Sequence, residues 1–225
     1  MIPPLPVLLV DDHPLITTAY KKAFEWVEQQ QTSIQFDLNE AHSLSEAIHA
    51  LERFQLHQPL GILFMDLKLP PLPQQHLYSG EDFALKVREK FPTTQIVIAT
   101  TYNHNFRIHS IFKSINPEGF LVKNDVNEGE IKQAILDILE GIPYYSKTVR
   151  QALRKYVSSD LLLDQMDRHL LYQLSIGTKT KDLTHFLPLS HPGVQRRKKN
   201  LKEIFEVEDQ DDRALLQAAK ELGFI

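Results

Sequence analysis

The alternation of short apolar runs with helix-period segments constrains the fold of this chain more than any other feature of its sequence. Each apolar run is followed by a segment whose apolar residues recur every three or four positions. This alternation is typical of parallel strands joined by crossover helices. We therefore expect an α/β fold with a doubly wound five-stranded parallel sheet, whose strands span 6–10, 34–41, 61–66, 95–100 and 119–123.

The segments between these runs carry local helix signals. Ser43, with Glu46 three residues later, predicts a capping box at the start of one helix. Another helix is expected over 128–140, and it should end at Gly141. A one-sided apolar stripe marks the first helix, formed by Ile16, Tyr20, Phe24 and Val27.

The pattern changes near residue 160, because the apolar residues beyond it follow helix periods only. We predict a domain over 1–143, a linker over 144–160 that includes a helical stretch, and a small all-α domain of four helices over 161–225. The expected helices span 164–175, 179–186, 191–205 and 211–222.

Composition excludes several classes of protein. Hydrophobic content of 42% and charged content of 24% are ordinary for a globular protein, and no apolar run reaches the length of a membrane span. The absence of cysteine excludes disulfides and thiolate metal sites. The first residues do not resemble a signal peptide. We therefore expect a cytoplasmic protein without a membrane partner. Its net charge of −4 means that nucleic-acid binding would need a local basic patch.

Polar side chains stand where the predicted strands end. Asp11 and Asp12 follow the first strand, and the last residues of the third, fourth and fifth strands are Asp66, Thr100 and Lys123. Ligands of an open parallel sheet gather at the carboxyl ends of its strands. If the first, third, fourth and fifth strands are neighbours, these side chains should meet in one pocket.

Clustered carboxylates repel one another unless a cation lies between them. Hard oxygen ligands favour Mg²⁺, which would neutralise the charge and leave one carboxylate free as a nucleophile towards phosphorus. Thr100 could then donate to a phosphoryl oxygen, and Lys123 could pair with another. Each residue alone is more often a turn, cap or surface residue, but five such residues on one sheet are hard to explain by capping.

Four motifs carry a family resemblance: "LLVDDHPL", "LFMDLKLPP", "IVIATTYN" and "GFLVKND". In this order, across 6–141, they resemble the receiver domain of two-component response regulators, which has a flavodoxin-like fold. The resemblance implies that Asp66 is the phosphoacceptor. It also implies that Mg²⁺ is bound by Asp11, Asp12 and Asp66 with the backbone carbonyl of Lys68.

The resemblance assigns roles to three further residues. Thr100 and Phe120 would form the switch pair, and Lys123 would contact the phosphoryl group. One departure is the long Pro-rich loop over 67–79, because the family's glycine arrives late here, at Gly80. This loop could change access for a kinase or phosphatase, or it could be an inert surface insertion.

The segment "RRKKNLK" places five basic residues within seven positions. A helical projection puts Val194, Leu201 and Phe205 on one side, with Ile204 at its margin. The opposite and flanking sides carry the candidate DNA contacts. Arg and Gln can read base edges, and Lys can meet phosphates. The candidates are Gln195, Arg196, Arg197, Lys198, Lys199 and Lys202.

The start of that helix is marked by Ser190 as N-cap and Pro192 in the first turn. The sequence from 163 to 225 resembles the helix-turn-helix DNA-binding domain of the LuxR/NarL type. Gly193 departs from the pattern, because it stands where the family often has Thr. It weakens the first helical turn by roughly 1 kcal/mol relative to Ala, which places DNA affinity in question.

The leading hypothesis is a response regulator that is not an enzyme. A sensor histidine kinase would phosphorylate Asp66, and the altered receiver surface would promote a homodimer that binds double-stranded DNA. One alternative is a Mg²⁺-dependent phosphohydrolase. Another is a receiver-based protein-interaction adaptor that no longer binds DNA.

Overall fold

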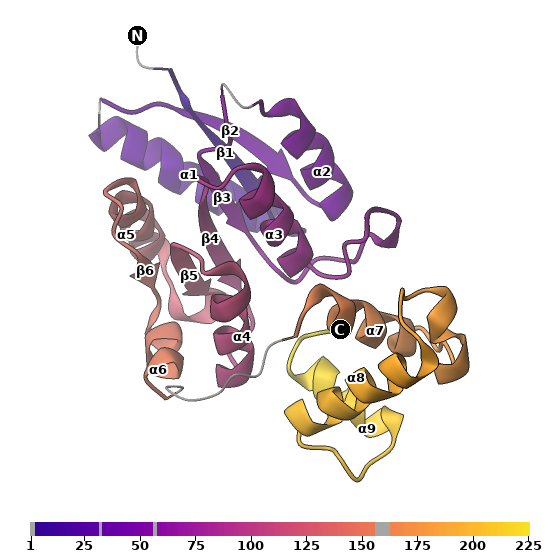
Figure 1. Ribbon diagram of the computed structural model, residues 1–225. Helices are drawn as coiled ribbons and strands as arrows, with labels where there is room; N and C mark the ends of the chain where they lie inside the picture. The colour runs from indigo at the N-terminus through magenta and orange to yellow at the C-terminus, as the bar shows by residue number, and fades with distance from the viewer. Residues whose placement is uncertain (1–2, 32, 56–57, 156–162) are drawn as a thin grey trace. The chain divides into compact units, whose positions relative to one another are not determined.

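The computed structural model describes residues 3–31, 33–55, 58–155 and 163–225. The chain divides into two compact units, Met1–Tyr156 and Val157–Ile225, which Figure 1 shows from indigo to yellow along the chain. The first unit is built around a sheet, and the second contains only helices and turns in its described part. Each unit is described by itself.

The sheet of the first unit has the strand order β2-β1-β3-β4-β5-β6, and every pair of neighbours is parallel. The five predicted strands are confirmed. The sixth strand was not predicted, because a two-residue strand shows no periodicity in sequence. The strands are β1 (Leu5–Val10), β2 (Phe36–Ala41), β3 (Ile62–Met65), β4 (Gln95–Thr100), β5 (Gly119–Val122) and β6 (Tyr144–Tyr145).

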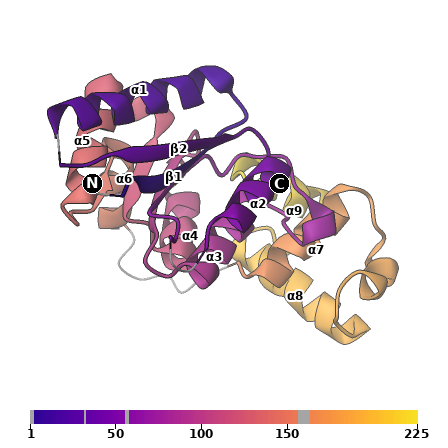
Figure 2. The ribbon, with the colours of Figure 1, turned by 90° about the horizontal axis from the view of Figure 1, so that it is seen from above.

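Helices cover both faces of this sheet, as Figure 2 shows from above. On one face lie α1 (Pro14–Gln30) and α5 (Glu128–Leu139), and on the other lie α2 (Leu44–Arg53), α3 (Gly80–Lys90) and α4 (Asn105–Ile115). Central strands are buried on both faces and therefore lack polar alternation. In β1, Val7 and Leu9 enter one core while Leu8 and Val10 enter the other.

The segment after α5 continues the sheet unit. Tyr144 N donates to Glu118 O at 3.0 Å, which attaches β6 to the edge of the sheet. Helix α6 (Lys147–Lys155) follows and buries Val149 and Ala152 in the core shared by α4 and β5. Residues 144–155 of the predicted linker are therefore packed on the first unit, while residues 156–160 lie outside the described residues.

The second unit contains α7 (Gln165–Ser175), the 3₁₀ helix η3 (Thr180–His185), α8 (His191–Ile204) and α9 (Asp212–Glu221). The helix predicted over 179–186 is 3₁₀ rather than α, because its turns close between residues three apart, as in Asp182 N to Lys179 O. Gly177 ends α7 at φ +87°, a conformation that glycine adopts without strain. Among the described residues, no helix combines the length and apolar character needed to cross a membrane.

The Pro-rich loop over 67–79 is folded rather than open. Leu72 and Leu77 exchange two backbone hydrogen bonds around the 3₁₀ turn η1 (Pro73–Gln75). Leu67, Leu69 and Leu77 are buried in the core, whereas residues 74–76 at the tip are exposed. The insertion is therefore anchored at its base and presents a polar tip.

Gly80 closes this loop against the strand end. Its amide donates to Leu67 O, and a Cβ at this position would lie 2.7 Å from that oxygen and 2.8 Å from Leu67 Cα. Backbone atoms cannot yield as a side-chain tip can. Only glycine therefore fits here without moving the residue that follows Asp66.

We predict that Gly80→Ala lowers the free energy of unfolding of the first unit by about 1–3 kcal/mol, because the added methyl group overpacks against backbone. Urea denaturation followed by circular dichroism measures the change. Gly129→Ala is the matched control, since its Cβ would meet only Asn127 Oδ1, at 3.2 Å. Equal stability of Gly80→Ala and wild type would contradict the close approach.

Candidate functional site: an acidic pocket and a basic helix

The strand registers bring the predicted pocket residues to one edge of the sheet. Val10 pairs with Met65, and Met65 pairs with Ile98. Thr100 pairs with Val122. The residue after each of these strands therefore lies at the carboxyl edge, where the connecting loops diverge.

Lys123 joins two buried carboxylates at this edge. Its Nζ donates to Asp11 Oδ2 at 2.6 Å and to Asp66 Oδ2 at 2.7 Å. The side chains of Asp11 and Asp66 are 0% and 4% exposed, and that of Lys123 is 14% exposed. Two buried like charges are therefore tolerated because one ammonium group satisfies both of them.

The pKa of Lys123 reflects this arrangement. Burial lowers it, but the hydrogen bonds that Lys123 donates to Asp11 and Asp66 outweigh burial and hold the pKa above its ordinary value. A raised pKa in the folded state means that Lys123 stays protonated throughout the neutral range. Its stabilising charge would be lost only in strongly alkaline solution.

The second oxygen of each buried carboxylate accepts a backbone hydrogen bond. Asp11 Oδ1 accepts from His13 N at 3.1 Å, and Asp66 Oδ1 accepts from Lys68 N at 2.9 Å. These bonds fix the rotamers of both carboxylates. They also show that the backbone of Lys68 lies at the pocket while its side chain is exposed.

Asp12 and His13 form the exposed rim of the pocket. Asp12 is 35% exposed, and His13 Nδ1 lies 2.6 Å from its Oδ1 and 3.4 Å from Asp11 Oδ1. Ligand atoms of Asp11, Asp12 and His13 all lie within 4.8 Å of one another. His13 is also the N-cap residue of α1.

The predicted switch pair occupies neighbouring strands. Thr100 and Phe120 are both fully buried, at the end of β4 and in β5. Thr100 Oγ1 accepts from Tyr102 N at 3.5 Å. The Phe120 ring stacks on Phe112 of α4 with centroids 5.6 Å apart. The aromatic residue is therefore packed into the α4 face of the sheet.

Tyr20 borders the pocket and was interpreted from sequence only as part of an apolar stripe. Burial raises its pKa far above the ordinary value, and the charges of Asp11 and Asp66 raise it further. Its ring packs on Phe64, with centroids 4.4 Å apart. Tyr20 therefore stays neutral in the electrostatic field of the two buried carboxylates. In the sequence, the hydroxyl group of Tyr20 within an otherwise apolar stripe is the one signal that could have identified it as a pocket residue.

In the second unit, α8 separates an apolar side from a polar side as predicted. Val194, Leu201 and Phe205 are buried and Ile204 is half-buried. Ser190 caps the helix, its Oγ accepting from Gly193 N at 3.4 Å. Gly193 leaves ordinary van der Waals space for a Cβ, so no close contact requires a glycine at this position.

The six predicted DNA contacts divide into two groups. Arg197 donates to Asp164 at 2.8 Å and Asp167 at 2.7 Å. The ammonium groups of Lys198 and Lys202 both pair with Asp212, at 2.8 Å and 3.3 Å. These three basic side chains therefore tie α8 to its own domain. The exposed group is Gln195, Arg196 and Lys199.

The ion pairs between α8 and its aspartate partners shift the pKa values of Asp212 and Arg197. Burial tends to raise the pKa of Asp212, but Lys198 and Lys202 outweigh it and hold the pKa below its ordinary value. Burial lowers the pKa of Arg197, and its two aspartate partners outweigh burial and raise it. Arg197 and Asp212 therefore stay charged at neutral pH, and the stability due to Asp212 is lost only as the pH falls below about 4.

Residues 7–136 match the family model described as the response regulator receiver domain. The match spans more than half of the chain and includes the whole acidic pocket. The chain belongs to the response regulator receiver domain family. The parallel sheet, its strand order and the pocket at its carboxyl edge are those expected for a response regulator.

Relatives of this response regulator match both of its units. The oxygen regulatory protein NreC of Staphylococcus epidermidis is 23% identical over 208 residues, which cover 87% of this chain and 88% of that protein. The transcriptional regulatory protein MctR of Rhizobium johnstonii is 27% identical over 206 residues, covering 89% and 86%. These relatives carry the names of regulatory proteins rather than enzymes.

Solved structures of RcsB share the fold of this response regulator. The structure of two RcsB dimers bound to two parallel DNAs has a TM-score of 0.59, with 20% identity and coverage of 97% and 99% of the two chains. RcsB from Salmonella enterica serovar Typhimurium, bound to promoter rprA with the phosphomimetic BeF3⁻, has a TM-score of 0.66, with 19% identity and coverage of 96% and 98%. The likeness shows a common fold.

We predict that Lys123→Met lowers the free energy of unfolding of this response regulator by about 3 kcal/mol, because it leaves Asp11 and Asp66 buried without a positive partner. Chemical denaturation at pH 7 without divalent ions measures the change. Lys21→Met is the control, since Lys21 pairs with Glu40 at the surface and should contribute far less. A loss no larger than that of Lys21→Met would show that the bridge does not stabilise the pocket.

Proposed function

We propose that this response regulator accepts a phosphoryl group on Asp66 from a sensor histidine kinase and regulates transcription by binding double-stranded DNA. The observation that carries the first part is the pair of buried carboxylates joined by Lys123 beside the exposed Asp12. This arrangement holds a nucleophilic oxygen, a positive charge and a further anionic ligand at one edge of the sheet.

The transfer step assigns a task to each side chain. An Asp66 carboxylate oxygen attacks phosphorus, the bond from phosphorus to the donor nitrogen of a phosphohistidine breaks, and the leaving imidazole takes the electron pair and a proton. Lys123 pairs with a phosphoryl oxygen as charge develops, and the Thr100 hydroxyl donates to another. Asp66 is held for attack by the hydrogen bond from Lys68 N.

The donor set at the rim is suited to Mg²⁺. Asp11, Asp12 and Asp66 supply hard carboxylate oxygens, and Asp12 is open to solvent. A bound Mg²⁺ would neutralise the phosphoryl oxygens during transfer. We assign the ligands to these three carboxylates and to the backbone carbonyl of Lys68. His13 then exchanges its contact with Asp12 for solvent.

Thr100 and Phe120 are proposed as the switch pair. Attraction of the Thr100 hydroxyl to the phosphoryl group would move β4 at its end, and the buried Phe120 ring would follow. The changed surface promotes a homodimer, which places two recognition helices on two DNA half-sites.

For DNA contact the exposed side of α8 is the proposed surface. Gln195 and Arg196 suit base edges, and Lys199 suits a phosphate. The prediction of six contacts is narrowed to these three, because Arg197, Lys198 and Lys202 are engaged by aspartates within the domain. RcsB, whose fold this chain shares, is bound to DNA in its solved structure, which supports a DNA-binding role for this protein.

We place the functional receiver at 1–155 and the DNA-binding domain at 163–225, and we assign the protein to the cytoplasm, where the kinase and DNA meet it.

Two alternative functions are also tested by the experiments below. Phosphohydrolase activity would require fast loss of the phosphoryl group from Asp66. The internal pairing of three basic side chains favours an adaptor without DNA binding. A titration with DNA tests this alternative, because an adaptor would not bind.

We expect acetyl phosphate with Mg²⁺ to add one phosphoryl group to wild type, because the acetate leaves as Asp66 attacks phosphorus. Asp66→Asn should incorporate none, and Asp82→Asn is the matched acidic control that should react as wild type does. Intact-protein mass spectrometry measures incorporation, and light scattering measures the accompanying dimer. Equal labelling of Asp66→Asn would refute the assignment, and steady release of phosphate in many turnovers would favour the phosphohydrolase.

We predict that Lys199→Ala weakens binding of the phosphorylated protein to random duplex DNA and lowers the salt slope by about 1, because one phosphate contact is lost. Fluorescence anisotropy over a salt series measures both quantities. Arg213→Ala on α9 removes an equally exposed charge and should leave the slope unchanged. Binding of neither wild type nor variants would establish the adaptor.

A further inference from the structure

Helix α6 is hydrogen-bonded to the turn that carries Lys123. Asp125 lies two residues after Lys123, in the 3₁₀ turn η2 (Lys123–Asp125). Its carboxylate accepts three hydrogen bonds from the start of α6: Ser146 Oγ at 2.9 Å, Thr148 N at 2.7 Å and Thr148 Oγ1 at 2.9 Å. The carboxylate thus caps α6 from outside the helix.

Ser146 is bonded to β5 on its other side. Its Oγ accepts from Val122 N at 3.1 Å, and its own amide donates to Phe120 O at 3.0 Å. The residues on both sides of Lys123 are therefore tied to the N-terminus of α6. Because these hydrogen bonds lie within two residues of Lys123, a movement of Lys123 should also move the N-terminus of α6.

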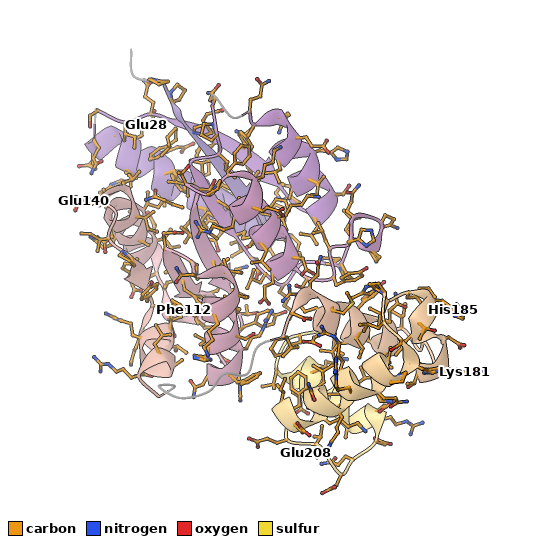
Figure 3. The ribbon with its side chains drawn as sticks, viewed as in Figure 1. Glu28, Phe112, Glu140, Lys181, His185 and Glu208 are labelled. Carbon is orange, nitrogen blue, oxygen red and sulfur yellow. The ribbon has the colours of Figure 1, made fainter. Side chains whose placement is uncertain are left out.

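A second path runs through aromatic rings. Phe120 stacks on Phe112, and Phe112 meets Tyr145 edge to face, with centroids 4.9 Å apart. Phe112 is labelled in Figure 3. Val149 and Ala152 of α6 are buried in the core that contains Phe120. The helix therefore shares a hydrophobic core with the proposed switch residue.

The negative charge of Asp125 strengthens its hydrogen bonds to the start of α6. Burial tends to raise the pKa of Asp125, but the hydrogen bonds from Thr148 and Ser146 outweigh it and hold the pKa below its ordinary value. Asp125 is therefore an anion at neutral pH, and its bonds to α6 are the stronger charge-assisted kind.

We propose that Asp125 is a positioning residue that couples the phosphorylation pocket to α6, so that α6 is latched on the α4–β5 face at rest and loosened when Asp66 is phosphorylated. The inference rests on the proposed function of Asp66. A phosphoryl group draws Lys123 Nζ away from Asp11, η2 moves with Lys123, and Asp125 carries the movement to α6. The helix precedes the second unit in the chain, so its release is a signal to the output domain.

The resting latch is tested by hydrogen exchange of the α6 amides, residues 147–155, in the full chain. Asp125→Ala should speed exchange by about fivefold to tenfold, because a helix cap is lost. Asp37→Ala removes an exposed carboxylate of β2 and should leave α6 unchanged. If Asp125→Ala does not fold, Thr148→Val removes one of the three bonds and should give a smaller effect of the same sign. Unchanged exchange in the folded variant would overturn the latch.

The coupling is tested by repeating the measurement after acetyl phosphate and Mg²⁺. Wild-type α6 should exchange at least about fivefold faster once phosphorylated, whereas Asp125→Ala should show less than about a twofold difference between its two states. A merely structural role for Asp125 would leave that difference intact. An equal difference in wild type and variant, or none in phosphorylated wild type, would overturn the proposal.

Phosphate incorporation is scored separately on the intact protein by mass. If wild type takes up no phosphoryl group, the proposed function of Asp66 fails and the coupling fails with it. If wild type is labelled but α6 does not respond, only the coupling fails. The two failures are therefore distinguished in the same samples.

Discussion

The bridge from Lys123 to Asp11 and Asp66 is the interaction on which the rest of the structure depends. It joins the ends of β1, β3 and β5 across the carboxyl edge of the sheet. Removing two carboxylates from water is unfavourable unless a positive charge meets both. In the proposed mechanism, Lys123 exchanges its contact with Asp11 for one with the phosphoryl group, so the bond that stabilises the resting pocket also responds to phosphorylation.

The second unit uses charge in a related way. Asp164, Asp167 and Asp212 engage three basic side chains of α8 and leave Gln195, Arg196 and Lys199 on the exposed side. The basic run in the sequence thus contains side chains that form ion pairs within the domain and side chains that are exposed to solvent. The internal pairs attach α8 to its own domain, and the exposed side chains are the proposed DNA contacts.

Much of the fold followed from the sequence, because apolar periodicity determines element type over long segments. The side chains at the ends of β1, β3, β4 and β5 were predicted to meet if these strands are neighbours, and the strand order makes them neighbours. What the sequence could not show was contact made by short or irregular segments. The two-residue β6, the 3₁₀ form of η3 and the clamp of Asp125 on α6 depend on tertiary hydrogen bonds without a periodic signal. The pairing of Arg197 with Asp167 likewise joins residues far apart in sequence.

The most direct test of the central claim is a crystal structure of the full chain with beryllofluoride and Mg²⁺. We predict a beryllofluoride group on Asp66, a metal ion held by Asp11, Asp12 and Asp66, and Lys123 Nζ moved from Asp11 onto a fluorine atom. A structure with both reagents present in which Lys123 keeps its bond to Asp11 and the ions lie elsewhere would contradict the account.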